Sequence, residues 1–455
     1  MEFRNLTPFP AMGFDSLDQR DALFHTVVLR QTFELQADLS LAFAEEQAPL
    51  VMSDMFYGEM NESSVKQESD LAPFKPNTDV IVIANGYSPA LTPMPRFMVG
   101  IKIIGKPAQQ PLPPYPQGLN QFLAPSDEWI AEWKADCARV QRHNSRDVVL
   151  LDKNLIVTGP RQWRKNTGLK RGLSLFSVAE WSLTEPQPIV ELPIRYEYAW
   201  GGANKVLASD KAASRVKAEN RLPPALIAAS SPPVVAHTVC LQNPLGMGFA
   251  EPWFLDATDP QVLSAPQIEA PDAPIVNFGQ PGSVQGMGVT GRAWQPRLPL
   301  AGTYDEKWIR QRHPYLPFDF NFGYWNAAPV DQQITPYLEG DETIILINLL
   351  PPSTPGRIRT ADGFAYKLSL PGHLPFVLVR FENGAIGELP AKLDTLILDL
   401  APDPAQPDKK PAVSCVWRAT VAGTPAVRVL EARMLASKAV QALRAQERNA
   451  DSLTY

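Results

Sequence analysis

The sequence predicts a mainly β protein with a few short helices, built as two β-rich, sandwich-like domains and a C-terminal helix. Three observations favour this fold class. Apolar and polar residues alternate over several short runs, which is the period of a strand. Proline accounts for 46 of the 455 residues, about twice its average usage, and prolines at this density interrupt helices. From residue 343 onward, one β-type run follows another, as in a sandwich.

The first 300 residues are expected to form the N-terminal β-rich domain. Alternating or β-branched runs predict strands at 24–35, 78–84, 97–104 and 193–200, and a hairpin over 148–158 that turns at 152–154. Ser126 can cap a helix over about 127–142, in which apolar residues recur every three or four positions. The polar and basic stretch 203–231 is expected to be a mobile excursion.

Residues 301–342 form an aromatic-rich segment that connects the two domains. Thr303 and Glu306 match a capping box, which predicts a short helix with Trp308 and Ile309 on its buried side and an end at Pro314. The second domain, 343–425, is predicted to contain strands at 343–350, 364–370, 376–381, 393–400 and 412–421. Residues 426–455 are assigned to a helix and tail, because 430–448 is rich in good helix formers.

Composition excludes several classes of protein. The net charge is −6 and lysine and arginine do not form a large cluster, which argues against a nucleic-acid partner. The N-terminus lacks the basic and apolar regions of a secretory signal, and no apolar run is long enough to span a membrane. We therefore expect a cytoplasmic protein without a membrane partner. Cys137, Cys240 and Cys415 are far apart in sequence and are most simply buried thiols.

The sequence contains no recognisable catalytic constellation. None of the five histidines falls in a metal-binding spacing, and neither a nucleophile elbow nor a Walker motif is present. Gly286, Gly288 and Gly291 match the GxGxxG spacing, but no clear strand precedes them and prolines follow where a helix should run. These glycines are expected to permit tight turns. We expect no cofactor, no metal ion and no enzymatic activity.

Three features leave two interpretations open. The aromatic residues between 308 and 325 either fill a core or form a partner-binding patch, since aromatic residues dominate interface hot spots. Arg195 and Glu197, two residues apart, either form ion pairs with a neighbouring strand or take part in binding. The terminal helix either docks on the sandwich or lies in a groove of a partner.

Short motifs, taken in order, resemble a bacterial family catalogued as domain of unknown function 2169. They are NLTPFPAMGF (5–14), KPNTDVIV (75–82), VTGPRQW (157–163), RYEYAWGG (195–202), NPLGMGF (243–249), TYDEKW (303–308), APVDQ (328–332) and YLEGDE (337–342). The motif positions singled out as possible partner-binding residues are Arg195, Tyr196, Glu197, Gly201, Gly202, Asn243, Pro244, Tyr304, Asp305, Trp308, Asp319 and Asp331. Trp200 stands where the family pattern has Phe.

The resemblance implies an accessory role in type VI secretion. Members of this family are similar to adaptors, or chaperones, that bind an effector in the cytoplasm, often one carrying a PAAR-like domain, and help to load it onto the VgrG spike. The resemblance supplies no catalytic residue. Two other hypotheses remain: a structural component of the secretion apparatus, and a carbohydrate-active enzyme that uses Asp305, Asp319 and Asp331.

Overall fold

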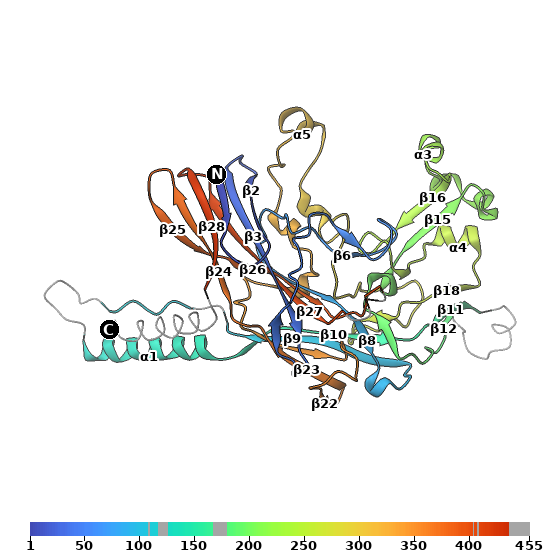
Figure 1. Ribbon diagram of the computed structural model, residues 1–455. Helices are drawn as coiled ribbons and strands as arrows, with labels where there is room; N and C mark the ends of the chain where they lie inside the picture. The colour runs from blue at the N-terminus through green and yellow to red at the C-terminus, as the bar shows by residue number, and fades with distance from the viewer. Residues whose placement is uncertain (108–109, 117–125, 167–179, 404, 407–408, 436–455) are drawn as a thin grey trace.

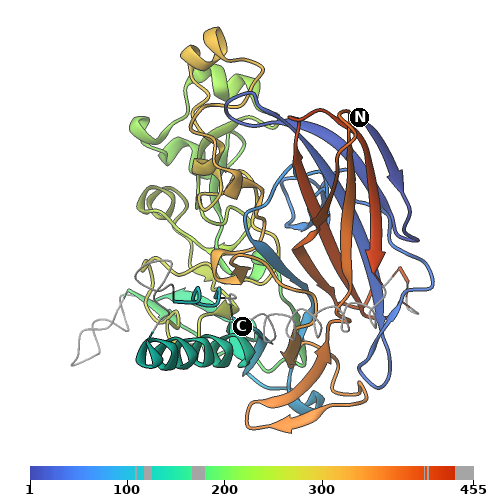
Figure 2. The ribbon, with the colours of Figure 1, turned by 90° about the vertical axis from the view of Figure 1, so that its left-hand side faces the viewer.

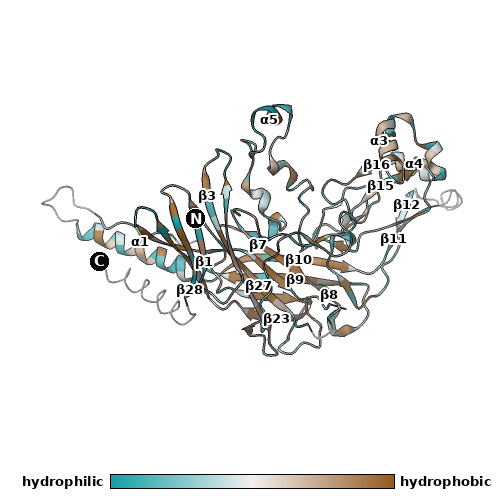
Figure 3. Cartoon of the chain, turned by 45° about the horizontal axis from the view of Figure 1, so that its top comes forward, coloured by the Kyte–Doolittle hydropathy of each residue, from teal (hydrophilic) through white to brown (hydrophobic). Residues whose placement is uncertain are grey.

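The computed structural model describes the chain except for residues 108–109, 117–125, 167–179, 404, 407–408 and 436–455. The fold is mainly β with a few short helices, as predicted (Figure 1). Each strand expected at 24–35, 78–84 and 97–104, and each of the five expected after residue 343, is confirmed by a strand at that place. Apolar residues gather on the strands at the centre of the molecule (Figure 3).

The largest sheet has seven strands. Six follow the order β2-β3-β27-β26-β7-β20, and β4 pairs with β3 at one end. Their bounds are β2 Ala11–Leu17, β3 Leu23–Leu35, β27 Ala412–Ala422, β26 Lys392–Asp399, β7 Thr78–Ile83, β20 Gln333–Ile334 and β4 Leu41–Phe43. All neighbours are antiparallel except β26 and β7, which run parallel.

Two further sheets pack on the inner face of the seven-stranded sheet. The four-stranded sheet has the order β1 (Glu2–Asn5), β28 (Val427–Leu435), β24 (Leu374–Phe381) and β25 (Ile386–Pro390). The six-stranded sheet has the order β19 (Ile268–Glu269), β10 (Val148–Thr158), β9 (Arg96–Gly105), β21 (Thr343–Ile347), β23 (Gly363–Ser369) and β22 (Ile358–Thr360). Apolar side chains from all three sheets form one continuous core, and burial of this area is the main source of stability.

Short elements complete the fold. The small sheets are β11 (Gln162–Lys165) with β12 (Trp181–Leu183) and β18 (Val262–Ser264), β8 (Asn85–Tyr87) with β13 (Glu191–Pro193), β14 (Trp200–Gly201) with β17 (Met247–Gly248), β15 (Ala203–Leu207) with β16 (Val234–Val239), and β5 (Met55–Phe56) with β6 (Val65–Gln67). The α-helices are α1 (Asp127–Ser145), α3 (Pro224–Ala229), α4 (Pro252–Thr258) and α5 (Glu306–Gln311). Short 3-10 turns are η1 (Pro89–Leu91), η2 (Tyr196–Tyr198), η3 (Lys211–Arg215), η4 (Ala218–Asn220), η5 (Leu298–Ala301), η6 (Phe322–Trp325) and η7 (Val330–Gln332).

The large sheets combine strands from both ends of the chain. β3 pairs with β27, β7 with β26, and β9 with β21, so strands from the first 300 residues share both sheets with strands from beyond residue 343. Figure 2 shows the blue N-terminal and red C-terminal strands side by side. The expected boundaries at 300 and 343 therefore do not coincide with any division between sheets. The segment 301–342 also contributes β20 to the seven-stranded sheet.

The helix predicted to follow Ser126 is confirmed as α1, and the Ser126 side chain accepts a hydrogen bond from the Trp129 amide. Three other local predictions are wrong. Residues 148–158 form the single strand β10 rather than a hairpin. Residues 193–200 are not one strand, because η2 interrupts them. Residues 427–435 form β28 rather than the start of a helix, and the rest of that predicted helix lies outside the described residues.

The stretch 203–231 is not a mobile excursion. It contains β15, η3, η4 and α3, which together with β16 and α4 form a small lobe beside the main sheets (Figure 1). The lobe has its own apolar cluster, made by Val206, Val216, Val235, Ala236 and Ala257. The polar residues of the stretch thus lie mainly on the surface of this lobe, while a few valines and alanines form its core.

Candidate functional site

Two of the family-like motifs, RYEYAWGG (195–202) and NPLGMGF (243–249), are joined by hydrogen bonds, and we call this pair of motifs the clasp. Asn243, which is fully buried, donates from Nδ2 to the carbonyl oxygens of Tyr196 and Trp200, at 2.9 and 3.0 Å. The Gly202 amide donates to the Asn243 carbonyl. Gly201 has φ +145°, and a Cβ there would collide with the Asn243 carbonyl oxygen. Gly201, Gly202 and Asn243 are buried and constrained by backbone packing, and the half-buried Pro244 lies beside them.

Arg195 and Glu197 hold another segment against this clasp. Glu197 accepts hydrogen bonds from the Ser64 amide and hydroxyl, at 2.8 and 2.5 Å. The Arg195 guanidinium lies 3.9 Å from the centroid of the Tyr57 ring. The expected ion pairs with a neighbouring strand are therefore wrong: the two side chains grip residues 57–64 through hydrogen bonds and a cation–π contact. Burial raises the pKa of Tyr57, while Arg195 opposes that shift.

Tyr196 packs into the glycine-rich segment 286–291. Its ring meets Trp294 edge-on at 5.1 Å, and its hydroxyl donates to the Gly288 carbonyl at 3.3 Å. A Cβ on Gly286 would strike the Tyr196 ring, so this glycine makes room for an aromatic side chain. Met287 is fully buried and its carbonyl accepts from the Val82 amide of β7. The segment is thus part of the core. None of the three glycines has a positive φ, so they do not serve the tight turns expected of them; Gly286 and Gly291 instead make room for the rings of Tyr196 and Trp294.

Charged side chains form a buried layer on the outer face of the seven-stranded sheet. Ion pairs join Arg30 to Asp70, Lys75 to Asp79, Arg418 to Asp394, Arg297 to Glu68, and Arg292 to both Glu68 and Asp54. The layer lies beneath residues 50–75, 287–297 and 324–333, and each of the five basic side chains has an acidic partner. Because the charges balance, we infer that the layer stabilises the packing of these segments rather than attracting an ion.

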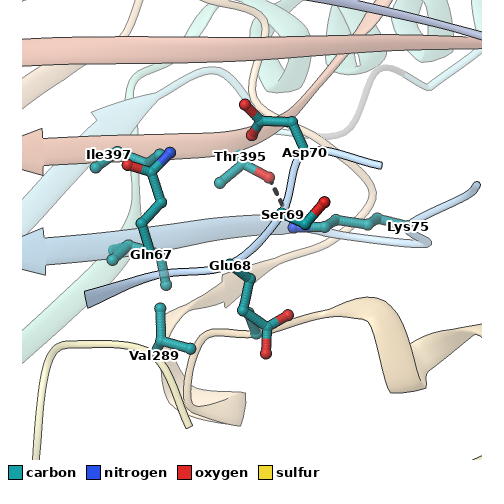
Figure 4. A pocket seen from close by; sticks show the side chains of 10 residues that line it. Gln67, Glu68, Ser69, Asp70, Lys75, Val289, Thr395 and Ile397 are labelled. Carbon is teal, nitrogen blue, oxygen red and sulfur yellow. Dashed lines mark hydrogen bonds between the residues drawn. The ribbon is translucent and has the colours of Figure 1, made fainter. Parts of the chain in front are cut away.

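A small cavity lies within this layer (Figure 4). It has a volume of about 20 Å³ and is lined by Gln67, Glu68, Ser69, Asp70, Lys75, Ile81, Val289, Ala327, Thr395 and Ile397. The Lys75 ammonium donates to Thr395 Oγ1 and Asp79 Oδ2, both at 2.9 Å. The volume suffices for about one water molecule, so the cavity is too small for a substrate.

Asp331 lies at the edge of the same region. Its carboxylate accepts from Lys153 Nζ of β10 at 2.7 Å, and the carboxylate is exposed whereas the lysine side chain is buried. Burial lowers the pKa of Lys153 against the opposing effect of Asp331. The pair fastens η7 to the six-stranded sheet, which is a structural role.

The remaining candidates belong to a projecting loop, residues 303–319, which we call the arm (Figure 1). Asp319 closes its base by accepting hydrogen bonds from the Thr303 amide and hydroxyl, at 3.0 and 2.7 Å, and these bonds lower the pKa of Asp319. Asp305, rather than Thr303, caps α5 by accepting from the Trp308 amide at 2.8 Å. Trp308 fills the arm: it contacts the Tyr304 ring at 4.6 Å and donates to the Tyr315 carbonyl.

Arg312 braces the arm against the loop between β2 and β3. Its guanidinium donates to both carboxylate oxygens of Asp21, at 2.6 and 2.8 Å, and to the Gln19 carbonyl at 2.7 Å. The same guanidinium lies 4.2 Å from the Phe318 ring and 5.7 Å from the Tyr315 ring. One buried cation therefore fixes both the orientation of the arm and the position of two aromatic rings on it.

The arm exposes large apolar side chains. Phe318 is 75% exposed and Ile309 is 60% exposed, although Ile309 was predicted to be on the buried side of its helix. Tyr304 and Tyr315 are also exposed, whereas Phe320 below the arm is buried and packs on Phe322, Tyr324 and Trp325. The aromatic segment is therefore divided: Phe320 is buried against half-buried rings, whereas the arm exposes its aromatic side chains at the surface.

The described residues contain no group of three or more His, Cys, Asp or Glu side chains that could hold a metal ion. Within the same part of the chain, no helix is both long and apolar enough to cross a membrane. All three cysteines are buried and free, as predicted. Asp305, Asp319 and Asp331 each have a separate structural partner, and no hydrogen bond between described residues joins any two of them.

Sequence reasoning missed the buried charges and Arg312. A signal for the charges existed, because Arg30 and Arg418 lie within the buried strands β3 and β27, on the face opposite the main core. A charge at such a position requires a buried partner. No comparable signal marked Arg312, whose partners lie about 290 residues away in sequence.

Comparison with known proteins gives one family. Residues 20–112 and 123–408 match the family described as "Uncharacterized protein conserved in bacteria (DUF2169)". No curated protein and no solved structure matches the chain. Because the match covers most of the chain, including the clasp, the arm and all of the charged layer except Arg418, the protein belongs to the DUF2169 family.

Proposed function

We propose that this chain is a cytoplasmic, non-enzymatic adaptor, or chaperone, that binds a type VI secretion effector carrying a PAAR-like domain and helps to load it onto the VgrG spike. The proposal starts from the resemblance of its ordered motifs to that family of accessory proteins. The single structural observation that supports it is the arm. An adaptor needs a preformed surface for a protein partner, and the arm presents aromatic and aliphatic side chains on a braced scaffold.

The chemistry of the arm suits a protein interface. Aromatic side chains and arginine are enriched among the residues that dominate binding energy. Phe318 and Tyr315 both contact Arg312, which is held by Asp21, so little side-chain entropy is lost when a partner covers them. Loading onto the spike requires later release of the effector, so a moderate affinity is expected.

Co-purification tests the proposal. The chain is expressed with the effector and spike genes encoded beside it, and the complexes are weighed by light scattering. We expect a stable complex with the effector and higher effector levels than without this chain. Replacing a central hot-spot side chain costs about 2 kcal/mol or more, so Phe318→Ala should weaken the complex roughly 30-fold.

A matched pair of variants separates the arm from the rest of the surface. Ile309 on the arm and Ile386 on β25 are both 60% exposed. Ile309→Ser should weaken the effector complex, and Ile386→Ser should not. Equal effects of the two variants would remove the arm from the interface. Sedimentation with the sheath or baseplate, without effector binding, would favour a structural component instead, and turnover of a glycan would favour an enzyme.

A further inference from the structure

A second surface feature lies at the far end of the molecule from the arm. The β22–β23 hairpin, η1 and the start of β9 border a groove of about 340 Å³. Figures 1 and 2 both place this hairpin and the arm at opposite ends. The groove is lined by Pro89, Met94, Phe97, Met98 and residues 359–364. Its walls are mostly apolar, and two methionines give them an adaptable shape.

The groove is preformed. Asn348, which is 2% exposed, donates from Nδ2 to the carbonyls of Met98 and Asp362, both at 2.8 Å, and accepts from the Phe364 amide at 2.9 Å. One side chain therefore joins β9 to the hairpin turn and to the start of β23. Gly363 has φ +133°, and a Cβ there would collide with the Asn348 side chain. A site held in this way loses little conformational entropy when it is occupied.

The groove adjoins an unpaired strand edge. β22 is the outermost strand of the six-stranded sheet, and among the described strands it pairs only with β23. All three of its residues are exposed, and the Ile358 side chain is 53% exposed. Backbone groups along such an edge can pair with an extended segment of another chain, while a neighbouring pocket receives one of its side chains.

The positive charge of two arginines beside the groove favours a partner with a negative charge. Arg359 lines the groove and Arg357 lies 4.9 Å above the Phe364 ring. Neither arginine forms an ion pair with any described residue, in contrast to the five basic side chains of the buried layer. Among the described residues that line the groove, Asp362 is the one with a carboxylate. The surface therefore complements a segment that carries both an apolar side chain and a carboxylate.

We propose that this groove binds an extended, acidic and apolar peptide segment of a protein partner, which adds to the edge of β22. An apolar side chain of the segment sits between Met94, Met98 and Phe364, and a carboxylate meets Arg359. This inference rests on the adaptor function, because it gives the adaptor a second contact, remote from the arm. Such a protein can hold two partners, or two parts of one effector, at the same time.

The test uses a library of random peptides of about ten residues, long enough to form one strand, displayed on phage and selected on the purified chain. Enriched peptides should combine apolar residues with Asp or Glu, and synthetic copies should bind in a fluorescence polarisation assay. Arg359→Glu and Met94→Glu should each weaken binding about tenfold or more. Arg215→Glu, a charge reversal at an exposed position in the small lobe, should leave binding unchanged.

Each other outcome overturns the proposal. Enriched peptides without acidic residues, no enrichment over the Arg359→Glu chain, or equal binding by all variants would exclude an acidic segment. A concentration-dependent dimer that Arg359→Glu abolishes would identify a second copy as the occupant. The role of the arm is judged by a separate assay. If the groove variants no longer bind the peptides but the arm variants still bind the effector, the proposal for the arm fails and the proposal for the groove stands.

Discussion

Replacing Asp79 with Asn tests whether the buried charged layer stabilises the fold. Asp79 is fully buried on β7. One of its oxygens accepts from Lys75 Nζ at 2.9 Å and the Ala327 amide at 2.8 Å, and the other accepts from Asn326 Nδ2 at 3.0 Å and the Ala328 amide at 3.1 Å. Asn has the same shape but one donor in place of an acceptor, so two of these four donors lose their partner whichever way the amide turns.

The expected cost follows from these contacts. Leaving a buried donor without a partner costs about 1–3 kcal/mol, so two such losses cost about 2–6 kcal/mol. Removing one partner of a buried ion pair costs about 3–5 kcal/mol. We therefore expect Asp79→Asn to lower the free energy of unfolding by about 4 kcal/mol, or roughly a thousand-fold in the ratio of folded to unfolded protein.

Urea unfolding followed by tryptophan fluorescence measures this change as a lower midpoint at an unchanged slope. Asp256→Asn is the matched control, since that side chain is 68% exposed, and it should change the free energy by less than about 0.5 kcal/mol. Adding Lys75→Met to Asp79→Asn should restore part of the loss, because the uncompensated ammonium is then gone. The reasoning would be refuted if Asp79→Asn were as mild as the control.

Three further predictions concern the clasp, the core and the cysteines. Gly201→Ala should destabilise the chain more than Gly384→Ala does, as midpoints of thermal unfolding can show. Both glycines have a positive φ, but of the two only Gly201 has no room for a Cβ, which would collide with Asn243. Burial raises the pKa of Glu342 above 4.5. The protonated carboxyl therefore contributes stability below pH 4.5, and this stability is lost as the pH rises through the raised pKa. Glu342→Gln should flatten this decline when urea midpoints are measured over a series of pH values. Cys415, 1% exposed in the sheet core, should resist maleimide until the chain unfolds, as mass spectrometry can check.

The sequence predicted the strands and the long helix well, because their patterns are local. In β3, Val27, Leu29, Phe33 and Leu35 share one face, and α1 has both a cap and an apolar stripe. The helix prediction was wrong at residues 427–435 because pairing with β1 on one side and β24 on the other outweighs the helix propensity of these residues. The turn-like residues at 152–154 also stay extended, since Asp152 pairs with Lys102 on the neighbouring strand β9 and Lys153 pairs with Asp331 of η7.

The candidate site was predicted only in part, for a different physical reason. Tyr196 looked like a strand residue because aromatic residues alternate around it. The Asn243 side chain donates hydrogen bonds to the carbonyl oxygens of Tyr196 and Trp200, and these bonds hold the segment in a turn. Likewise, the exposure of Phe318 depends on Arg312 reaching Asp21. These outcomes depend on contacts between residues far apart in sequence, which local periodicity cannot register.

The pairing of β3 with β27 has a consequence for synthesis of the protein. β3 ends at residue 35, whereas β27 begins at residue 412, and the two lie side by side over eleven paired residues. At about 5–20 residues per second, the ribosome needs roughly 20 to 80 s to supply that partner. During this time the edge of β3 that pairs with β27 has no native partner, and an open strand edge can pair with other chains, so the nascent chain depends on protection from aggregation. A premature stop codon anywhere before β27 would remove the central strand of the largest sheet and leave no independently folded fragment of it.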